Sequence, residues 1–238
     1  APALKTANIG VAMGVTGTDV SKEAADMVLT DDNFASIVKA IEEGRGIYDN
    51  IRKTLQYLLA GNTGELLLMT ICVVIGLPTP LLPIHLLWIN LVTDGAPALA
   101  LGLDPGDPGL MERPPRPATE HVITRQMWGG IFFVGVVMAA GTLYVLDADL
   151  PGGLVPGAGS LRHAQTMAFT TLMLFQLFNL FNARSDEDSA FRGLLDNHWL
   201  LAAIALSVTV SIGAETIGTR RRSPGKSSVL VSTSLGRI

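Results

Sequence analysis

Long apolar segments alternate with polar loops along most of this chain, and they limit its fold more than any other feature. Four segments reach the length of about 20 residues that a helix needs to cross a lipid bilayer, whereas the fifth loses its apolar character after about 14. In chain order they are 57–77, 81–103, 127–146, 164–182 and 199–212. The pattern predicts a mainly α-helical, polytopic membrane helix bundle surrounded by a lipid bilayer.

The composition excludes two broad classes of protein. Charged residues make up 16% of the chain, whereas a typical soluble domain contains about a quarter. The net charge is −4 and the basic residues are scattered, so the chain offers no continuous basic stripe for a nucleic acid. The single cysteine, Cys72, lies inside an apolar segment, where we expect a small buried side chain without a redox or metal role.

The part of the chain before the first apolar segment has the mixed composition of a water-soluble region. A strand is expected at 9–13, and a short helix capped by Asp19 is expected to run through Met27. A polar residue at 31–33 is expected to cap a second helix, whose apolar positions keep helical spacing into the first apolar segment. We therefore expect residues 34–56 to form a stalk that enters the bilayer.

Lysine and arginine are unequally distributed over the loops, which predicts the orientation of the chain in a cell membrane. The stalk and the loops at 104–126 and 183–197 carry most of these residues, whereas the turn at 76–85 carries none. Because basic residues accumulate on the cytoplasmic side of membrane proteins, residues 1–56 are expected in the cytoplasm.

The end of the chain departs from this charge rule. A basic cluster at 220–222 would lie outside if the fifth segment crossed the bilayer. Either that segment does not cross, or the sequence after about Thr209 is not the tail with which this membrane domain evolved. We favour the second explanation and treat residues 213–238 as an atypical basic and serine-rich tail.

Polar side chains that carry oxygen atoms interrupt the first and second apolar segments. In the second segment, Asn90, Thr93 and Asp94 follow helical spacing and are expected on one face. In the first segment, Asn62 and Glu65 are expected on one face for the same reason. A helix rises about 1.5 Å per residue, which places the two carboxylates at about the same depth in the bilayer.

Two carboxylates at one depth in a bilayer need a partner. They repel each other unless a cation or a proton lies between them, and carboxylates inside a membrane usually mark ion pathways. The side chain of Gln176 reaches the same depth from the fourth segment, and the combined oxygens approach the about six to eight that Ca²⁺ takes. We predict a metal site formed by Asn62, Glu65, Asn90, Thr93, Asp94 and Gln176.

Alternatives remain open for this site. Asn62 and Asn90 are equally well explained as hydrogen-bonding residues between helices, and Gln176 as a packing hydrogen bond. Pro97 lacks the N–H that would bond the carbonyl of Thr93, so the second segment is expected to loosen there, as broken helices do in transporters. Mn²⁺, Na⁺ and H⁺ remain alternatives to Ca²⁺, because oxygen ligands alone do not fix the ion.

Several separate blocks of sequence carry a family resemblance. They are Ile-Gly-Val-Ala-Met-Gly at 9–14, Ala-Ala-Asp-Met-Val-Leu-Thr-Asp-Asp-Asn-Phe at 24–34, Glu-Gly-Arg-Gly-Ile-Tyr-Asp-Asn at 43–50 and Leu-Trp-Ile-Asn-Leu-Val-Thr-Asp-Gly at 87–95. In this order, and over about residues 1–208, the chain resembles the P-type cation ATPases, in particular their calcium-transporting branch.

The resemblance implies a fold, an activity and partners. Residues 1–33 would be the end of a small α/β phosphorylation domain, and the segments within 57–212 would be the fifth to ninth of ten spans. The six predicted site residues fall on the family's ion-ligand positions, although Gln176 stands where the two-calcium pumps of animal reticulum carry Glu. The implied parent is a translocase that moves Ca²⁺ through an aspartyl-phosphate cycle with Mg-ATP, and the missing N-terminal part of the same pump would be the partner of this chain.

The chain would then supply most of the ion site but no ATP site, so we expect it to be inactive alone. A second hypothesis is a non-enzymatic membrane channel or a truncated regulatory membrane protein. The soluble start of the chain counts against a channel, because a pore needs no cytoplasmic domain.

Overall fold

The computed structural model describes residues 1–105, 109–117, 119–153, 159–184 and 197–220, and in the last of these stretches it describes side chains as far as Ser211. The chain divides into two compact units. One comprises Ala1–Ile51 and Pro105–Glu120, and the other comprises Arg52–Asp104 and His121–Ile238.

The first unit contains a two-stranded parallel sheet. β1 (Val11–Met13) pairs with β2 (Met27–Leu29), and the N–H of Gly14 extends the pairing by donating to the carbonyl of Leu29 at 2.7 Å. The helices here are α1 (Pro2–Thr6), α2 (Asp19–Ala24) and the first part of α3 (Ala35–Ile75). Two parallel strands joined through a helix form a small α/β unit.

Two details of the sequence prediction are wrong in this unit. Helix α2 ends at Ala24 and not at Met27, because Met27 begins β2 and its pairing with β1 excludes a helix there. The N-cap is Thr18 and not Asp19, since the Thr18 side chain accepts the hydrogen bond from the Ser21 N–H. The predicted strand at 9–13 is confirmed for its last three residues.

Side-chain hydrogen bonds fix the loop between β2 and α3. Asn33 Oδ1 accepts a hydrogen bond from the Ala35 N–H at 3.0 Å, which confirms a cap within residues 31–33. Asp32, whose φ is 51°, accepts hydrogen bonds from the N–H groups of Val15 and Thr16. The Thr16 hydroxyl and these N–H groups hold the pKa of Asp32 below its ordinary value. The ionised carboxylate therefore ties the loop after β1 to the loop after β2.

The first part of α3 contacts the loop at 109–117 through two arginine interactions. Arg45 donates a hydrogen bond to the carbonyl of Leu110 at 2.6 Å, and Arg113 pairs with Asp49 at 2.9 Å. Helix α3 is a single helix from Ala35 to Ile75, and the cytoplasmic stalk at 34–56 stays a prediction.

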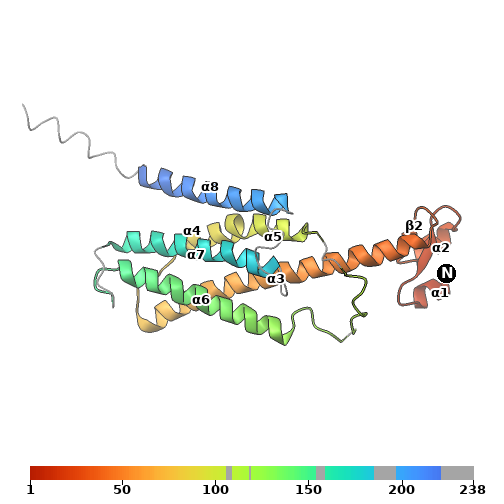
Figure 1. The fold of residues 1–238 in the computed structure, drawn as a ribbon, viewed down its shortest axis with the longest axis horizontal. Helices are drawn as coiled ribbons and strands as arrows, with labels where there is room; N and C mark the ends of the chain where they lie inside the picture. The colour runs from red at the N-terminus through yellow and green to blue at the C-terminus, as the bar shows by residue number, and fades with distance from the viewer. Residues whose placement is uncertain (106–108, 118, 154–158, 185–196, 221–238) are drawn as a thin grey trace, which may run out of the picture. The chain divides into compact units, whose positions relative to one another are not determined.

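The second unit is a bundle of apolar helices (Figure 1). α6 and α7 pack along each other, while α8 packs against α5 and against a π-helical turn, η1. Besides the second part of α3, the elements are α4 (Pro83–Trp88), η1 (Ile89–Thr93), α5 (Gly95–Gly102), α6 (Arg125–Asp149), α7 (Leu161–Arg184) and α8 (His198–Arg220). The prediction of a mainly α-helical chain is confirmed.

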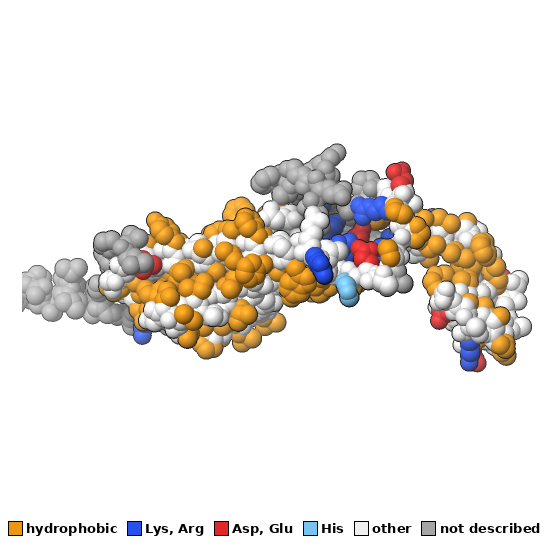
Figure 2. Space-filling view, turned by 90° about the horizontal axis from the view of Figure 1, so that it is seen from below, with side chains coloured by type: hydrophobic (Ala, Val, Ile, Leu, Met, Phe, Trp, Pro, Cys, Tyr) orange, Lys and Arg blue, Asp and Glu red, His pale blue; other side chains and the backbone are white. Residues whose placement is uncertain are grey.

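Three helical stretches of the described chain are long and apolar enough to cross a membrane, namely α3, Pro83–Gly102 and α6. Figure 2 shows hydrophobic side chains over much of the visible face of the bundle, as expected for a surface in lipid. Helix α7 has the length but is not among the three, because polar residues such as Gln165, Gln176 and Asn179 interrupt it. Its crossing, expected from sequence, stays a prediction.

Helix α8 packs into the bundle beyond the point where the sequence was expected to lose its native character. Within the residues whose side chains the structure describes, its apolar part is His198–Ser211, and a fifth crossing stays a prediction. Ser211 accepts a hydrogen bond from Trp88 Nε1 at 3.1 Å, so the packed part of α8 includes residues after Thr209.

Two separate apolar clusters hold the bundle together. The first contains Leu68 and Cys72 of α3 together with Met138 of α6, and the second contains Tyr57 of α3 and Leu180 of α7. Cys72 is fully buried, as predicted. Along both α3 and α7, a short stretch that belongs to neither cluster separates the two.

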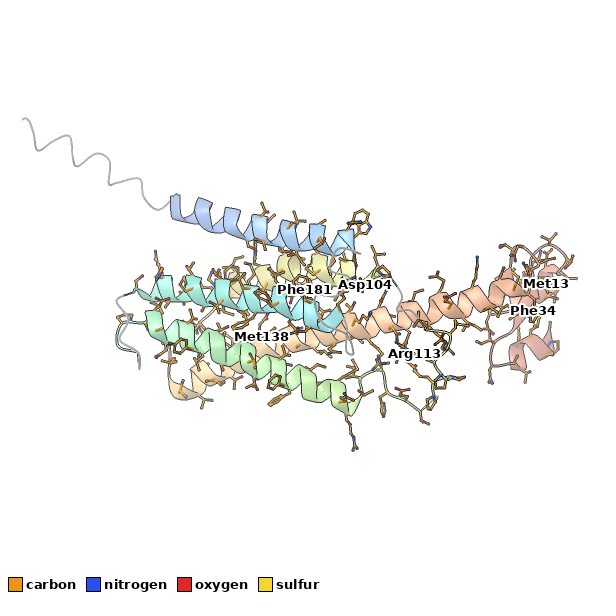
Figure 3. All side chains as sticks on the ribbon, in the orientation of Figure 1. Met13, Phe34, Asp104, Arg113, Met138 and Phe181 are labelled. Atoms are coloured by element: carbon orange, nitrogen blue, oxygen red, sulfur yellow. The ribbon has the colours of Figure 1, made fainter. Side chains whose placement is uncertain are left out.

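Small residues let α3 and α6 approach each other closely. A Cβ added to Gly64 would lie 3.1 Å from the Cβ of Met138, which is labelled in Figure 3. A Cβ added to Gly135 would lie only 2.7 Å from a methyl group of Thr63. Glycines at such contacts are typical of packed membrane helices.

A buried ion cluster joins the ends of several helices around Asp104, which follows α5 (Figure 3). Its carboxylate accepts hydrogen bonds from Arg184 Nε at 3.1 Å and from Asn197 Nδ2 at 2.9 Å. Lys53 Nζ of α3 lies 3.9 Å away. Asn197 also caps α8 by accepting a hydrogen bond from the Leu200 N–H. One carboxylate therefore connects α3, α5, α7 and α8.

We predict that Asp104→Asn destabilises the bundle by about 3–5 kcal/mol, because it leaves two buried cations without their carboxylate. The control is Asp149→Asn, whose carboxylate is 28% exposed and lies 3.9 Å from His163. It should cost less than about 1 kcal/mol. Denaturant unfolding of the full chain in micelles, followed by the loss of helical circular dichroism, measures both. Equal effects of the two substitutions would contradict the structural role of the Asp104 cluster.

Candidate cation site

Helix α3 presents Glu65 on the same face as Tyr57 and Gly61, because residues four apart lie above one another on a helix. The side chains of Tyr57 and Glu65 are buried, with exposed fractions of 1% and 7%. Sequence reasoning found Glu65 but missed the other two. The regular spacing of four residues was the signal that could have revealed them.

Hydrogen bonds to the Glu65 carboxylate connect α3 with α7 and η1. Its Oε1 accepts a hydrogen bond from Gln176 Nε2 of α7 at 2.9 Å. Its Oε2 accepts one from Asn90 Nδ2 of η1 at 3.1 Å. The structure thus brings together three of the predicted residues, and it does so through neutral donors.

Asp94 lies between η1 and α5 and is almost fully buried, with an exposed fraction of 2%. Its Oδ1 accepts a hydrogen bond from the hydroxyl of Tyr57 at 3.0 Å. Tyr57 is therefore the residue of α3 that contacts the second carboxylate, a role that the sequence did not indicate.

Three buried oxygens of the predicted residues have no hydrogen-bond partner in the part of the chain that the structure describes. An unsatisfied polar group in such a place costs about 1–3 kcal/mol. The three atoms are Thr93 Oγ1, Asp94 Oδ2 and Gln176 Oε1. Oxygens of a hydroxyl, a carboxylate and an amide are the ligands that hard cations such as Ca²⁺ prefer.

Gly61 lies where these groups converge. A Cβ added to this residue would lie 3.2 Å from Gln176 Nε2 and 3.7 Å from Asp94 Oδ2. Since Gln176 also bonds Glu65, its amide lies between the two carboxylates. The absence of a side chain at Gly61 leaves room for this arrangement.

The helix is interrupted at the site itself. η1 is a π-helical turn, in which the Asp94 N–H donates to the carbonyl of Ile89, five residues earlier, at 2.9 Å. The second segment therefore loosens as expected, but the loosening begins on the N-terminal side of Pro97. The expected α-helical spacing of Asn90, Thr93 and Asp94 is therefore replaced by the wider spacing of a π turn.

The predicted residues differ in exposure. Thr93, Asp94 and Gln176 are buried, whereas Asn90 is exposed and reaches the site only through its bond to Glu65. Asn62 is exposed as well. Glu65, three residues later on the same helix, is buried, so Asn62 lies toward the edge of the face that Glu65 occupies and its part in the site stays a prediction.

The chemistry of the site is that of two carboxylates supplemented by neutral oxygens. Among the described residues, no group of three or more histidine, cysteine, aspartate or glutamate side chains is placed to hold a metal ion. The side chains that do converge carry no imidazole or thiolate, the ligands that favour transition metals.

Comparison with known proteins now identifies the class. A protein-family model described as "Cation transporting ATPase, C-terminus" matches residues 78–215, more than half of the chain. The chain belongs to this family of P-type cation-transporting ATPases, which confirms the resemblance found in the sequence. The match also extends beyond Thr209 to residue 215.

Individual relatives are calcium-transporting ATPases. The chain is 45% identical over 216 residues to the calcium-transporting ATPase of Bacillus subtilis, an alignment that covers 89% of this chain and 23% of the relative. It is 41% identical to calcium-transporting ATPase 1 of Yarrowia lipolytica and 39% identical to the human calcium-transporting ATPase type 2C member 2, with 87% of this chain and 22% of each relative covered. The chain thus spans about a quarter of the length of these relatives.

We predict that Gly61→Ala weakens calcium binding about tenfold, since overpacking by one methyl group costs about 1–3 kcal/mol. The added Cβ would press on the Gln176 amide. The test protein is a hybrid pump, in which residues 1–215 of this chain replace the matching part of the Bacillus subtilis relative. Its calcium dependence of ATP hydrolysis measures the effect.

The matched control is Gly129→Ala on α6, where an added Cβ meets nothing within 4 Å. This variant should keep the calcium dependence of the unmodified hybrid. If Gly61→Ala behaved like Gly129→Ala, the close packing around Gly61 would have no part in cation binding.

Proposed function

We propose that this chain forms the larger part of the cation site of an ATP-driven calcium pump. The observation that carries the proposal is the set of unpartnered buried oxygens on Thr93, Asp94 and Gln176, next to the carboxylate of Glu65. A cation accepted by these oxygens would remove both the cost of burying them and the repulsion between the two carboxylates.

The two amides explain how the site can both bind and release a cation. In the structure, Asn90 and Gln176 donate N–H groups to Glu65, which stabilises its carboxylate without a cation. If a cation takes over the carboxylate, each amide can turn and offer its oxygen instead. Exchange between these two arrangements keeps binding reversible, as transport requires.

We assign the ligand role to the six predicted residues together. Asn62 and Asn90 are exposed, and the rest of the ligand shell would come to them from the earlier part of the pump. The full set is Asn62, Glu65, Asn90, Thr93, Asp94 and Gln176.

Calcium is the cation that the relatives and the charge of the site support best. The relatives are named calcium-transporting ATPases, and two carboxylates balance the charge of one divalent ion. Mn²⁺ shares this charge and the preference for oxygen, whereas Na⁺ or H⁺ would leave one negative charge in the membrane.

The rest of the chain fits the same proposal. Residues 1–33 would end the phosphorylation domain and residues 34–56 would be the cytoplasmic stalk. The uninterrupted helix α3 would carry motion from this stalk to Glu65. Residues 57–212 would form the membrane domain, and the earlier part of the parent protein would bind Mg-ATP and carry the phosphorylated aspartate.

We predict that Asp94→Asn in the hybrid pump reduces calcium-dependent phosphorylation by ATP at least a hundredfold, because half of the negative charge of the site is lost. Radioactive phosphate incorporated into the pump in the presence and absence of calcium gives the measurement. Asp149→Asn, which changes a carboxylate at the end of α6, should leave the incorporation unchanged. Normal calcium dependence of Asp94→Asn would remove Asp94 from the site and would reopen the hypothesis of a non-enzymatic membrane protein.

A further inference from the structure

Two serines of α8 contact the interrupted helix next to the cation site. The hydroxyl of Ser207 donates to the carbonyl of Val92 in η1 at 3.2 Å, and Ser211 accepts a hydrogen bond from Trp88 Nε1 at 3.1 Å. Both serine side chains are buried, with exposed fractions of 0% and 1%. The partners are four residues apart on each side, so one turn of α8 lies along one turn of the interrupted helix.

The carbonyls of this turn need donors from outside their own helix. Pro97 has no N–H, so it cannot bond the carbonyl of Thr93, four residues earlier, in an α-helical register, or that of Val92, five residues earlier, in a π-helical register. A carbonyl without a partner is costly in a bilayer, because no water is present to replace the bond. The hydroxyl of Tyr57 lies 3.5 Å from the Thr93 carbonyl, and that of Ser207 lies 3.2 Å from the Val92 carbonyl. The proton of Tyr57 is donated to Asp94 at 3.0 Å, so among these two hydroxyls Ser207 is the one that supplies a donor to a carbonyl just before Asp94.

Ser207 directs its hydroxyl away from its own helix. A serine in a helix commonly bonds the carbonyl four residues earlier on the same helix. Thr63, Thr166 and Thr170 make such bonds in this chain. The hydroxyl of Ser207 instead bonds the backbone of η1, which indicates that this contact serves the turn rather than α8.

We propose that Ser207 and Ser211 are positioning residues of the cation site. Their hydrogen bonds in the described part of the chain go to the carbonyl of Val92 and to the indole of Trp88, not to the side chains proposed as ligands. Ser207 holds the backbone of η1 in its π-helical form and Ser211 anchors the residue just before it, and this backbone sets the positions of Thr93 and Asp94. The inference rests on the proposed function, because it assigns to α8 a part in the affinity of the same site.

Ser207→Ala in the hybrid pump should raise the calcium concentration for half-maximal ATP hydrolysis about fivefold to tenfold, since a buried carbonyl loses its donor. The maximal rate should stay within about twofold, because no proposed ligand is changed. Thr209→Val is the control, since Thr209 is exposed on the same helix. An unchanged calcium dependence of Ser207→Ala would overturn the proposal.

A double-mutant cycle with Pro97→Ala separates positioning from general packing. Alanine at 97 restores an N–H, so the carbonyls before it need the serine less. Ser207→Ala should then shift the calcium dependence less than about twofold in the Pro97→Ala background. If Ser207→Ala shifts the calcium dependence by the same factor with and without Pro97→Ala, Ser207 does not act on the carbonyls near Pro97. That result would contradict the proposal.

Backbone hydrogen exchange of residues 89–98 tests the contact without relying on transport. In the full chain in micelles, Ser207→Ala should exchange faster in this segment than Thr209→Val, and equal exchange would overturn the proposal. If Ser207→Ala does not assemble, Ser207→Cys replaces it, because cysteine keeps the volume but is a weaker donor. An unmodified hybrid that does not respond to calcium would refute the proposed function, whereas a responsive hybrid insensitive to Ser207→Ala would refute only the role of α8.

Discussion

Two carboxylates buried among apolar helices impose the constraint on which the rest of this structure depends. A third buried carboxylate, Asp104, is paired with Arg184 and Lys53, so its charge is balanced by the protein itself. The hydrogen bonds to Glu65 and Asp94 come only from amides and a phenol in the described chain. These neutral donors stabilise the carboxylates but do not balance their charge. Asp104 is thus suited to a structural role, whereas the other two fit the proposed role in cation binding.

The interruption of the helix at η1 is the second feature on which the proposed site depends. A regular α-helix uses all of its carbonyls internally, so it cannot adapt where an ion enters and leaves. The π turn before Asp94 and the proline after it release carbonyls, which Tyr57 on one side and Ser207 on the other approach. The two apolar clusters fix α3 and α7 on either side of this place, so the interrupted backbone lies between two packed regions.

The sequence predicted those parts of the fold and the site that depend on regular helices. Glu65 and Gln176 lie on uninterrupted helices, so a constant rise per residue placed them at one depth, and they do bond each other. The same reasoning did not predict the π turn at Ile89–Thr93, which changes the spacing of the side chains there. Strand β2 was missed because three apolar residues fit a helix as well as a strand. The Asp104 cluster was missed because its members come from distant segments that only tertiary packing brings together.

The most direct test of the central claim is an experimental structure of the hybrid pump with bound Ca²⁺. We predict that the ion lies about 2.3–2.6 Å from carboxylate oxygens of both Glu65 and Asp94. The amide of Gln176 should be turned so that its oxygen faces the ion. An ion bound elsewhere, with both carboxylates still held only by Gln176, Asn90 and Tyr57, would contradict it.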